Sequence, residues 1–322
     1  MSETIARAQV SNAATFVALP PLPSADFEVS DDARLNLRDI SKRYHACVQE
    51  EMAKLHADGA NGQTVVDLYT RHIDRLVDYL FEAATRLYAR RYSQLHQRCA
   101  VFALGGYGRG ELNLYSDIDL LFLHPWKITP YVETVCETIY YSLMDAGFAV
   151  GQVVRNVPMC VRLANQDLTV KTSLLDNRYL CGDETLRKEF ATAMTREIVG
   201  KHADRFYQEK AQESRDRHQK YGGAIYMLEP DLKEGKGGLR DLHTAGWLAK
   251  VKYKVGEIRE LIPKGIIAMS QLGAVEAARD FMWKVRNGLH ILARAEHDHL
   301  TFEYQDQLAP ALGFSDVTSF MR

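Results

Sequence analysis

The stretch that decides the fold is residues 101–124, which read VFALGGYGRGELNLYSDIDLLFLH. An apolar run at 101–104 is followed by a glycine-rich segment, and a second apolar run occupies 120–123. Two short apolar runs on either side of such a segment predict two β-strands joined by a loop. Asp117 and Asp119 open the second strand. Because alternate strand residues point to the same face, we expect the two carboxylates to lie side by side.

This pattern is typical of a metal-assisted nucleotide site. Two carboxylates a few ångströms apart repel each other unless a cation lies between them. Mg²⁺ prefers oxygen ligands and commonly takes one or two carboxylates together with substrate phosphates. The glycines would leave backbone N–H groups accessible to a polyphosphate. The alternative is a plain glycine-rich turn followed by two solvated aspartates.

Two other nucleotide-binding motifs are excluded by the same residues. A P-loop ends in Gly-Lys-Ser/Thr, whereas this loop ends in Gly110-Glu111-Leu112. The dinucleotide fingerprint requires a third glycine three residues after its second one. Counted from Gly106 and Gly108, that position is Glu111. The glycine cluster therefore matches neither motif, and it is its occurrence together with the two carboxylates that favours the metal-assisted site over the plain turn.

The composition of the chain argues against several classes of protein. The 322 residues include 40 basic and 42 acidic side chains, a balance that argues against broad electrostatic binding of nucleic acid. Five scattered cysteines without a CxxC pair indicate a reducing compartment and no structural zinc. No apolar run approaches the roughly 18 residues of a membrane span, and no secretory signal is visible. We expect a soluble, cytoplasmic protein without membrane or nucleic-acid partners.

Elsewhere the periodicity is mostly helical. Helices are predicted at 31–56, 64–97, 130–146, 157–165, 186–213, 239–253 and 270–294, and a third strand at 148–154. Residues 1–29, with three prolines, predict a flexible leader.

A second motif lies at residues 229–241, EPDLKEGKGGLRD. Lys233, Lys236 and Arg240 surround three glycines just before a predicted helix. Free N–H groups, the positive end of a helix and flexible cationic side chains make a plausible anion site. The alternative is a structural turn that packs the helical region on the core.

His297-Asp298 could be taken for the HD pair of a metal-dependent phosphohydrolase. That chemistry needs further histidine and aspartate ligands from several helices, and His290 and His299 do not supply them convincingly. We therefore interpret this pair as part of a surface helix.

Gly105-Gly106, ten further residues and then Asp117-Ile118-Asp119 resemble the signature of the polymerase-β-type nucleotidyltransferase superfamily. The longer string GGYGRGEL…YSDIDLL is similar to the transferase part of the bacterial PII uridylyltransferase/uridylyl-removing (GlnD) family, as are 229–241 and 286–305. The resemblance covers most of the chain from about residue 30. It implies an α+β fold: a polymerase-β-like core with a small mixed sheet, flanked by N- and C-terminal helical regions.

The resemblance also implies a domain order. After the leader at 1–29, we expect an N-terminal helical region at 30–98, the nucleotidyltransferase core at 99–183 and a helical domain at 184–322. In the family an HD hydrolase domain and two ACT ligand-sensing domains follow. Neither is expected in this chain, so the uridylyl-removing activity should be missing.

The activity implied is Mg²⁺-dependent transfer of UMP from UTP to a tyrosine of the PII signalling protein, with release of pyrophosphate. The resemblance assigns the metal to Asp117, Asp119 and Asp176, the last as a third carboxylate on a strand facing the first two. The residues expected to bind the nucleotide are Gly105, Gly106, Arg109, Ser116, Lys233, Lys236 and Arg240.

Three alternatives stay open. The chain could be an adenylyl or other nucleotidyl transferase with a different acceptor, since nothing in the glycine loop reads the base. It could be a non-catalytic nucleotide-binding regulator, although such a module does not need clustered carboxylates. It could add nucleotides to nucleic-acid ends, although its charge is nearly neutral.

Overall fold

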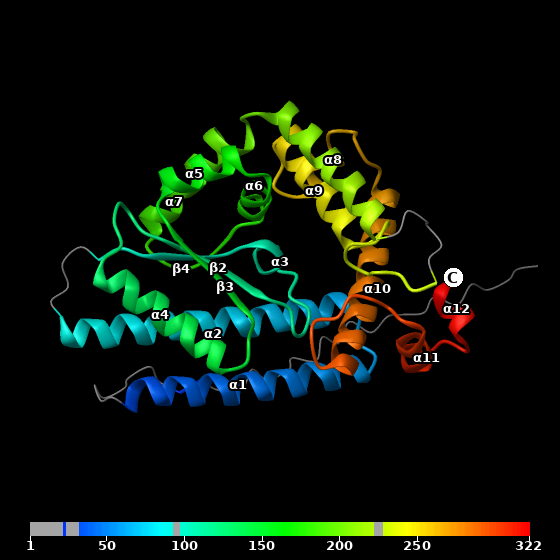
Figure 1. The fold of residues 1–322 in the computed structure, drawn as a ribbon, viewed down its shortest axis with the longest axis horizontal. Coiled ribbons are helices and arrows are strands. Elements are labelled where there is room, and N and C mark those ends of the chain that lie inside the picture. The colour runs from blue at the N-terminus through cyan, green and yellow to red at the C-terminus, as the bar shows by residue number, and fades with distance from the viewer. Residues whose placement is uncertain (1–21, 24–31, 93–96, 222–227) are drawn as a thin grey trace, which may run out of the picture.

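The computed structural model describes residues 22–23, 32–92, 97–221 and 228–322. Apart from residues 22 and 23, the leader predicted at 1–29 lies outside this part of the chain. The centre of the molecule is a four-stranded sheet with the order β3-β2-β1-β4 (Figure 1). Its strands are β1 (Ala100–Ala103), β2 (Ile118–Leu123), β3 (Val150–Arg155) and β4 (Arg178–Gly182). A small mixed sheet among helices confirms the predicted α+β class.

The strand pairing brings β1 and β4, which are distant in the sequence, side by side. Strand β1 runs antiparallel to both β2 and β4, whereas β2 and β3 are parallel. Parallel neighbours need a crossover connection, and helix α4 (Pro130–Asp145) supplies it. In the β2–β3 register Asp119 lies opposite Gly151.

Helices cover both faces of the sheet (Figure 1). One face packs against α1 (Asp32–Ala57), α2 (Gly62–Arg91) and α4, and it receives Leu120 and Phe122 from β2. The other face receives Leu121 and Leu123 and packs beneath α5 (Val157–Gln166), α6 (Leu168–Leu175) and α7 (Glu184–Ala193). By the same alternation, Asp119 belongs to this second face.

The glycine-rich segment is not a loop throughout. Its first half forms a short helix, α3 (Gly105–Gly108), directly after β1. A Cβ at Gly108 would lie 1.7 Å from the backbone oxygen of Asp176, so only glycine allows α3 to approach the end of α6 this closely.

The long helix predicted at 186–213 is broken. It consists of α7, a π-helical turn (Met194–Val199) and α8 (Ala203–Lys220). His202, which precedes α8, has a left-handed backbone with φ of 55°, and a continuous helix cannot include that conformation.

The remaining helices follow α8 in the chain. They are α9 (Leu239–Tyr253), a 3₁₀ turn (Ile258–Leu261), α10 (Met269–Ala293), α11 (Phe302–Ala311) and α12 (Val317–Met321). Helix α10 reaches back to the start of α2, where the backbone N–H of Gln63 donates to Asp280 at 2.6 Å (Figure 1). Among the described helices, none combines the length and the apolar character needed to cross a membrane.

Candidate active site

A cavity of about 490 Å³ lies between the second face of the sheet and helices α9 and α10. Its volume is within the usual range of small-molecule sites, about 300–1,000 Å³. Nine of the residues predicted from the sequence line it: Gly105, Gly106, Arg109, Ser116, Asp117, Asp119, Asp176, Lys233 and Arg240. Lys236, which the structure also describes, is exposed and does not line the cavity.

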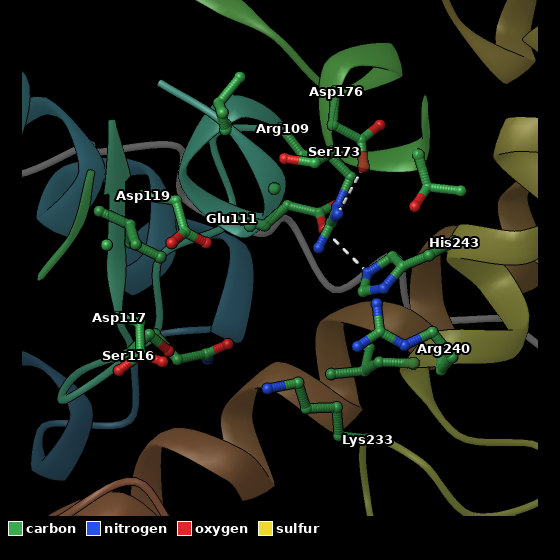
Figure 2. A pocket seen from close by; sticks show the side chains of 18 of the residues that line it. Arg109, Glu111, Ser116, Asp117, Asp119, Ser173, Asp176, Lys233, Arg240 and His243 are labelled. Carbon is green, nitrogen blue, oxygen red and sulfur yellow. Dashed lines mark hydrogen bonds and ion pairs between the residues drawn. The ribbon is translucent and has the colours of Figure 1, made fainter. Parts of the chain in front are cut away.

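Asp117 and Asp119 form one side of this cavity (Figure 2). Asp117 immediately precedes β2, and Asp119 is the second residue of the strand. Burial raises the pKa of Asp119, and the charge of Asp117 raises it further. Burial and Glu296 raise the pKa of Asp117. The surroundings thus disfavour the ionised form of both carboxylates, and a bound cation would stabilise that form.

The neighbouring strand leaves room for Asp119. A Cβ at Gly151 would lie only 2.3 Å from Asp119 Oδ1. Any side chain at position 151 would therefore displace the carboxylate. A glycine inside a strand pattern often marks such a close approach, so this residue could have been found in the sequence.

Asp176 does not join the two aspartates, contrary to the sequence-based expectation. It caps the C-terminal end of α6 instead of lying on a strand, and only 2% of its surface is exposed. Its Oδ2 accepts hydrogen bonds from Arg109 Nη1 and Trp247 Nε1, both at 2.7 Å. Its Oδ1 accepts one from Lys250 Nζ at 2.9 Å. These hydrogen bonds tie Asp176 to Arg109, Trp247 and Lys250 in the cavity wall, and its role as a metal ligand stays a prediction.

Arg109 continues that wall. Its Nε donates to Glu111 Oε2 at 2.6 Å, and His243 Nε2 lies 3.0 Å from the same oxygen (Figure 2). Burial alone would raise the pKa of Glu111, but Arg109 and His243 hold it well below its usual range. Burial and the charge of Arg109 lower the pKa of His243 to about 4, so the imidazole is neutral near pH 7. Arg109 lines the cavity, but it donates its hydrogen bonds to the carboxylates of Glu111 and Asp176.

The 229–241 block supplies the cations on the opposite side (Figure 2). Lys233 Nζ lies 2.9 Å from Glu296 Oε1, and Arg240 Nη2 lies 2.7 Å from Glu234 Oε1. The block is also a structural turn, because Leu232 donates its N–H to the backbone oxygen of Asp298 at 2.8 Å. Two of its three cations, Lys233 and Arg240, thus line the cavity, whereas anion binding by the block stays a prediction.

The surface helix expected around His297-Asp298 is wrong. Residues 294–301 connect α10 to α11 without helical structure, and the Asp298 side chain is only 12% exposed. Its carboxylate accepts a hydrogen bond from Arg286 Nε at 2.6 Å and lies 3.1 Å from His290 Nε2. Within the described ranges, no group of three or more His, Cys, Asp or Glu residues is arranged to hold a metal, so no HD-type centre forms there.

Several residues of the site gave no signal in the sequence. His243, Trp247 and Lys250 carry no motif that connects them to Glu111 and Asp176, because these partners are distant in the chain. His243 follows the 229–241 block by two residues, and Lys250 lies two turns further along the same helix. The packing of α9 against α6 brings Trp247 and Lys250 to Asp176, and His243 of the same helix reaches Glu111.

Two family models match the chain. Residues 46–161 match the nucleotidyltransferase family DUF294, and residues 205–322 match the family described as GlnD PII-uridylyltransferase. The first match contains the glycine-rich segment with Asp117 and Asp119. The second contains the basic block and helices α9 to α12.

Curated relatives cover both regions. The chain is 40% identical over 248 residues to the bifunctional uridylyltransferase/uridylyl-removing enzyme of Rhodospirillum rubrum, covering 77% of this chain and 26% of that protein. Proteins of the same name from Rhodopseudomonas palustris and a Bradyrhizobium species are 37% and 38% identical over 290 residues, covering 85% of this chain and 31% of each. The chain thus spans between a quarter and a third of the length of these relatives. These matches confirm the resemblance carried by the motifs: the chain is similar to nucleotidyltransferases over 46–161, to the GlnD PII-uridylyltransferase family over 205–322, and to part of the bifunctional uridylyltransferase/uridylyl-removing enzymes.

Proposed function

We propose that this chain transfers UMP from UTP to a tyrosine of the PII protein and releases pyrophosphate, in a reaction that depends on Mg²⁺. One observation carries the proposal. Asp117 and Asp119 lie beside Gly105 and Gly106 in one cavity, within a chain similar to the GlnD family. The curated relatives are named for uridylyl transfer, which supports UTP as the donor.

Nucleotidyltransferases generally use a divalent metal, and the residues here fit one. Asp117 and Asp119 supply oxygen donors, their pKa values are raised, and Gly151 leaves space around the Asp119 carboxylate. Two carboxylates are enough for Mg²⁺, because it commonly completes its octahedron with substrate phosphates and water. When bound, the metal would neutralise charge on the phosphates and lower the pKa of the attacking hydroxyl.

The chain's own groups would bind the triphosphate. Gly105 and Gly106 are the first two residues of α3, and the first N–H groups of a helix have no partner within that helix. Lys233 and Arg240 face this side from the 229–241 block. Their present carboxylate partners, Glu296 and Glu234, are partly exposed, so phosphate oxygens can compete for the same cationic groups.

The Arg109–Glu111–His243 wall would exclude water and fix the shape of the cavity. Its charges are paired internally, so it can contact the nucleotide without changing ionisation. In the reaction, the acceptor oxygen forms a bond to the α-phosphorus while the bond between that phosphorus and the pyrophosphate oxygen breaks. A tyrosine hydroxyl ionises near pH 10, so the site must assist the loss of its proton.

The direct test is incubation of the chain with UTP, Mg²⁺ and purified PII, followed by intact-mass measurement of PII. A gain of one UMP per PII subunit is expected, with pyrophosphate released in equal amount. No gain in mass would overturn the proposal. A gain of AMP from ATP, with none from UTP, would overturn the assignment of the donor.

A further inference from the structure

The chain segment that leads into Asp117 is a tight turn in an unusual conformation. The N–H of Ser116 donates to the backbone oxygen of Asn113 at 3.1 Å. Tyr115, within the turn, has a φ of 63°, in the left-handed region that non-glycine residues rarely adopt. Such a turn persists only when surrounding groups hold it in place.

Helix α10 supplies those groups, and the central one is Asn287. Its side chain is completely buried, 0% exposed. Its Oδ1 accepts two hydrogen bonds from the turn: one from Asn113 Nδ2 at 2.9 Å and one from the backbone N–H of Leu114 at 3.2 Å. A single oxygen atom thus fixes both the side chain and the backbone of the turn.

Neighbouring residues of α10 complete the contact. Arg286 Nη1 donates to Asn113 Oδ1 at 2.7 Å, so both ends of the Asn113 amide are bound by α10. His290 Nδ1 hydrogen-bonds the backbone oxygen of Leu114. Arg286 and His290 are themselves held by Asp298, from the segment after α10. We call Arg286, Asn287, His290 and Asp298 the clamp.

We propose that Asn287 is a positioning residue for nucleotidyl transfer: through the 113–116 turn it fixes Asp117 where a divalent metal binds. The inference rests on the proposed function for its connection to catalysis. Asn287 lies 170 residues beyond Asp117 in the sequence and contacts the turn, not the carboxylate. Its effect is therefore exerted through backbone geometry, as expected of an outer group that orients a metal ligand.

The experiment compares Asn287→Ala with Asn287→Asp. N287A removes the acceptor oxygen, whereas N287D keeps an oxygen in the same place. We expect faster hydrogen–deuterium exchange in the peptide covering 112–118 of N287A. Mn²⁺, titrated with a non-hydrolysable UTP analogue present, should bind about tenfold more weakly, the usual cost of losing an outer partner of a metal ligand. N287D should restore slow exchange and tight Mn²⁺ binding.

The Mg²⁺ concentration for half-maximal UMP transfer should rise by a similar factor in N287A, while the KM for PII stays unchanged. Asp280→Ala is the matched control, because it removes another hydrogen bond of α10, which Asp280 accepts from Gln63 and not from the turn. Wild-type exchange and Mn²⁺ affinity in N287A, or the same changes in D280A, would overturn the proposal. Weaker Mn²⁺ binding by N287A in a protein that transfers no UMP would leave the positioning role standing and remove the proposed function.

Discussion

Gly151 faces Asp119 across the β2–β3 pair so closely that an added Cβ would lie 2.3 Å from Asp119 Oδ1. We therefore expect Gly151→Ala to push the carboxylate out of position. UMP transfer should fall at least about tenfold, because outer contacts that orient a metal ligand carry that much activity. Overpacking should cost about 1–3 kcal/mol in the free energy of unfolding. Transfer rates at saturating Mg²⁺, together with urea denaturation, measure both effects.

Gly273→Ala is the control for that substitution. Gly273 lies within α10, and no heavy atom is within 4 Å of an added Cβ. Replacing a helical glycine by alanine should raise stability by about 0.5–1 kcal/mol and leave transfer unchanged. Equal activity in G151A and the wild type would show that Asp119 does not need its present position.

Asp117→Asn should abolish transfer with little effect on folding. The substitution removes one charge from the carboxylate pair, and Asp117 is exposed. A loss of several kcal/mol of transition-state stabilisation corresponds to a decrease of at least about a hundredfold in kcat. Asp145→Asn is the matched control, since Asp145 is another exposed aspartate, 3.7 Å from Arg38 and outside the cavity. Intact-mass analysis of PII gives the rates, and wild-type transfer by D117N would contradict the assignment.

Asp176→Ala tests whether this residue supports the wall or binds metal. Its removal takes a buried carboxylate partner from both Arg109 and Lys250, and breaking such a pair typically costs about 3–5 kcal/mol. We expect that loss in chemical denaturation, while the Mg²⁺ concentration for half-maximal residual transfer stays at its wild-type value. A large shift in Mg²⁺ requirement with unchanged stability would restore Asp176 as a metal ligand.

The raised pKa of Asp119 predicts how stability changes with pH. Because the folded state binds more protons than the unfolded state above the ordinary carboxyl pKa of about 4, stability falls as pH rises through the range between the two values. Asp119→Asn removes this effect. Without divalent ions, D119N should be more stable than the wild type at about pH 7, and the difference should vanish below about pH 4.

Urea denaturation in EDTA at several pH values measures this difference. Adding Mg²⁺ should then stabilise the wild type and not D119N, because a ligand that binds only the folded state shifts the equilibrium toward it. Lower stability of D119N at neutral pH would show that Lys233 already satisfies the carboxylate.

The sequence predicted those features of the fold and the site that depend on residues close together in the chain. The glycine-rich segment, the Asp117/Asp119 pair and the apolar runs around them place the two carboxylates on one face of β2, and nine of ten predicted site residues line one cavity. What sequence could not provide depends on tertiary packing. The family resemblance assigns Asp176 to the metal, whereas the local pattern does not reveal its partners Trp247 and Lys250, which lie more than seventy residues away.

The same limit explains the error at Asp298. A carboxylate next to histidine in a charged segment has the composition of a solvated surface. Its carboxylate pairs with Arg286 of α10, which also donates a hydrogen bond to Asn113. The hydrophobic periodicity of the residues around Asp298 does not predict such a long-range contact.

The wall formed by His243, Glu111, Arg109 and Asp176 alternates neutral, negative, positive and negative groups, and each ionic member already has its counter-charge. A dipolar lining of this kind is preorganised, so little reorganisation energy is spent on it when a highly charged substrate arrives. We therefore expect the site to select among nucleotides by excluding donors that fit poorly, because the paired charges of the wall do not rearrange to accommodate them.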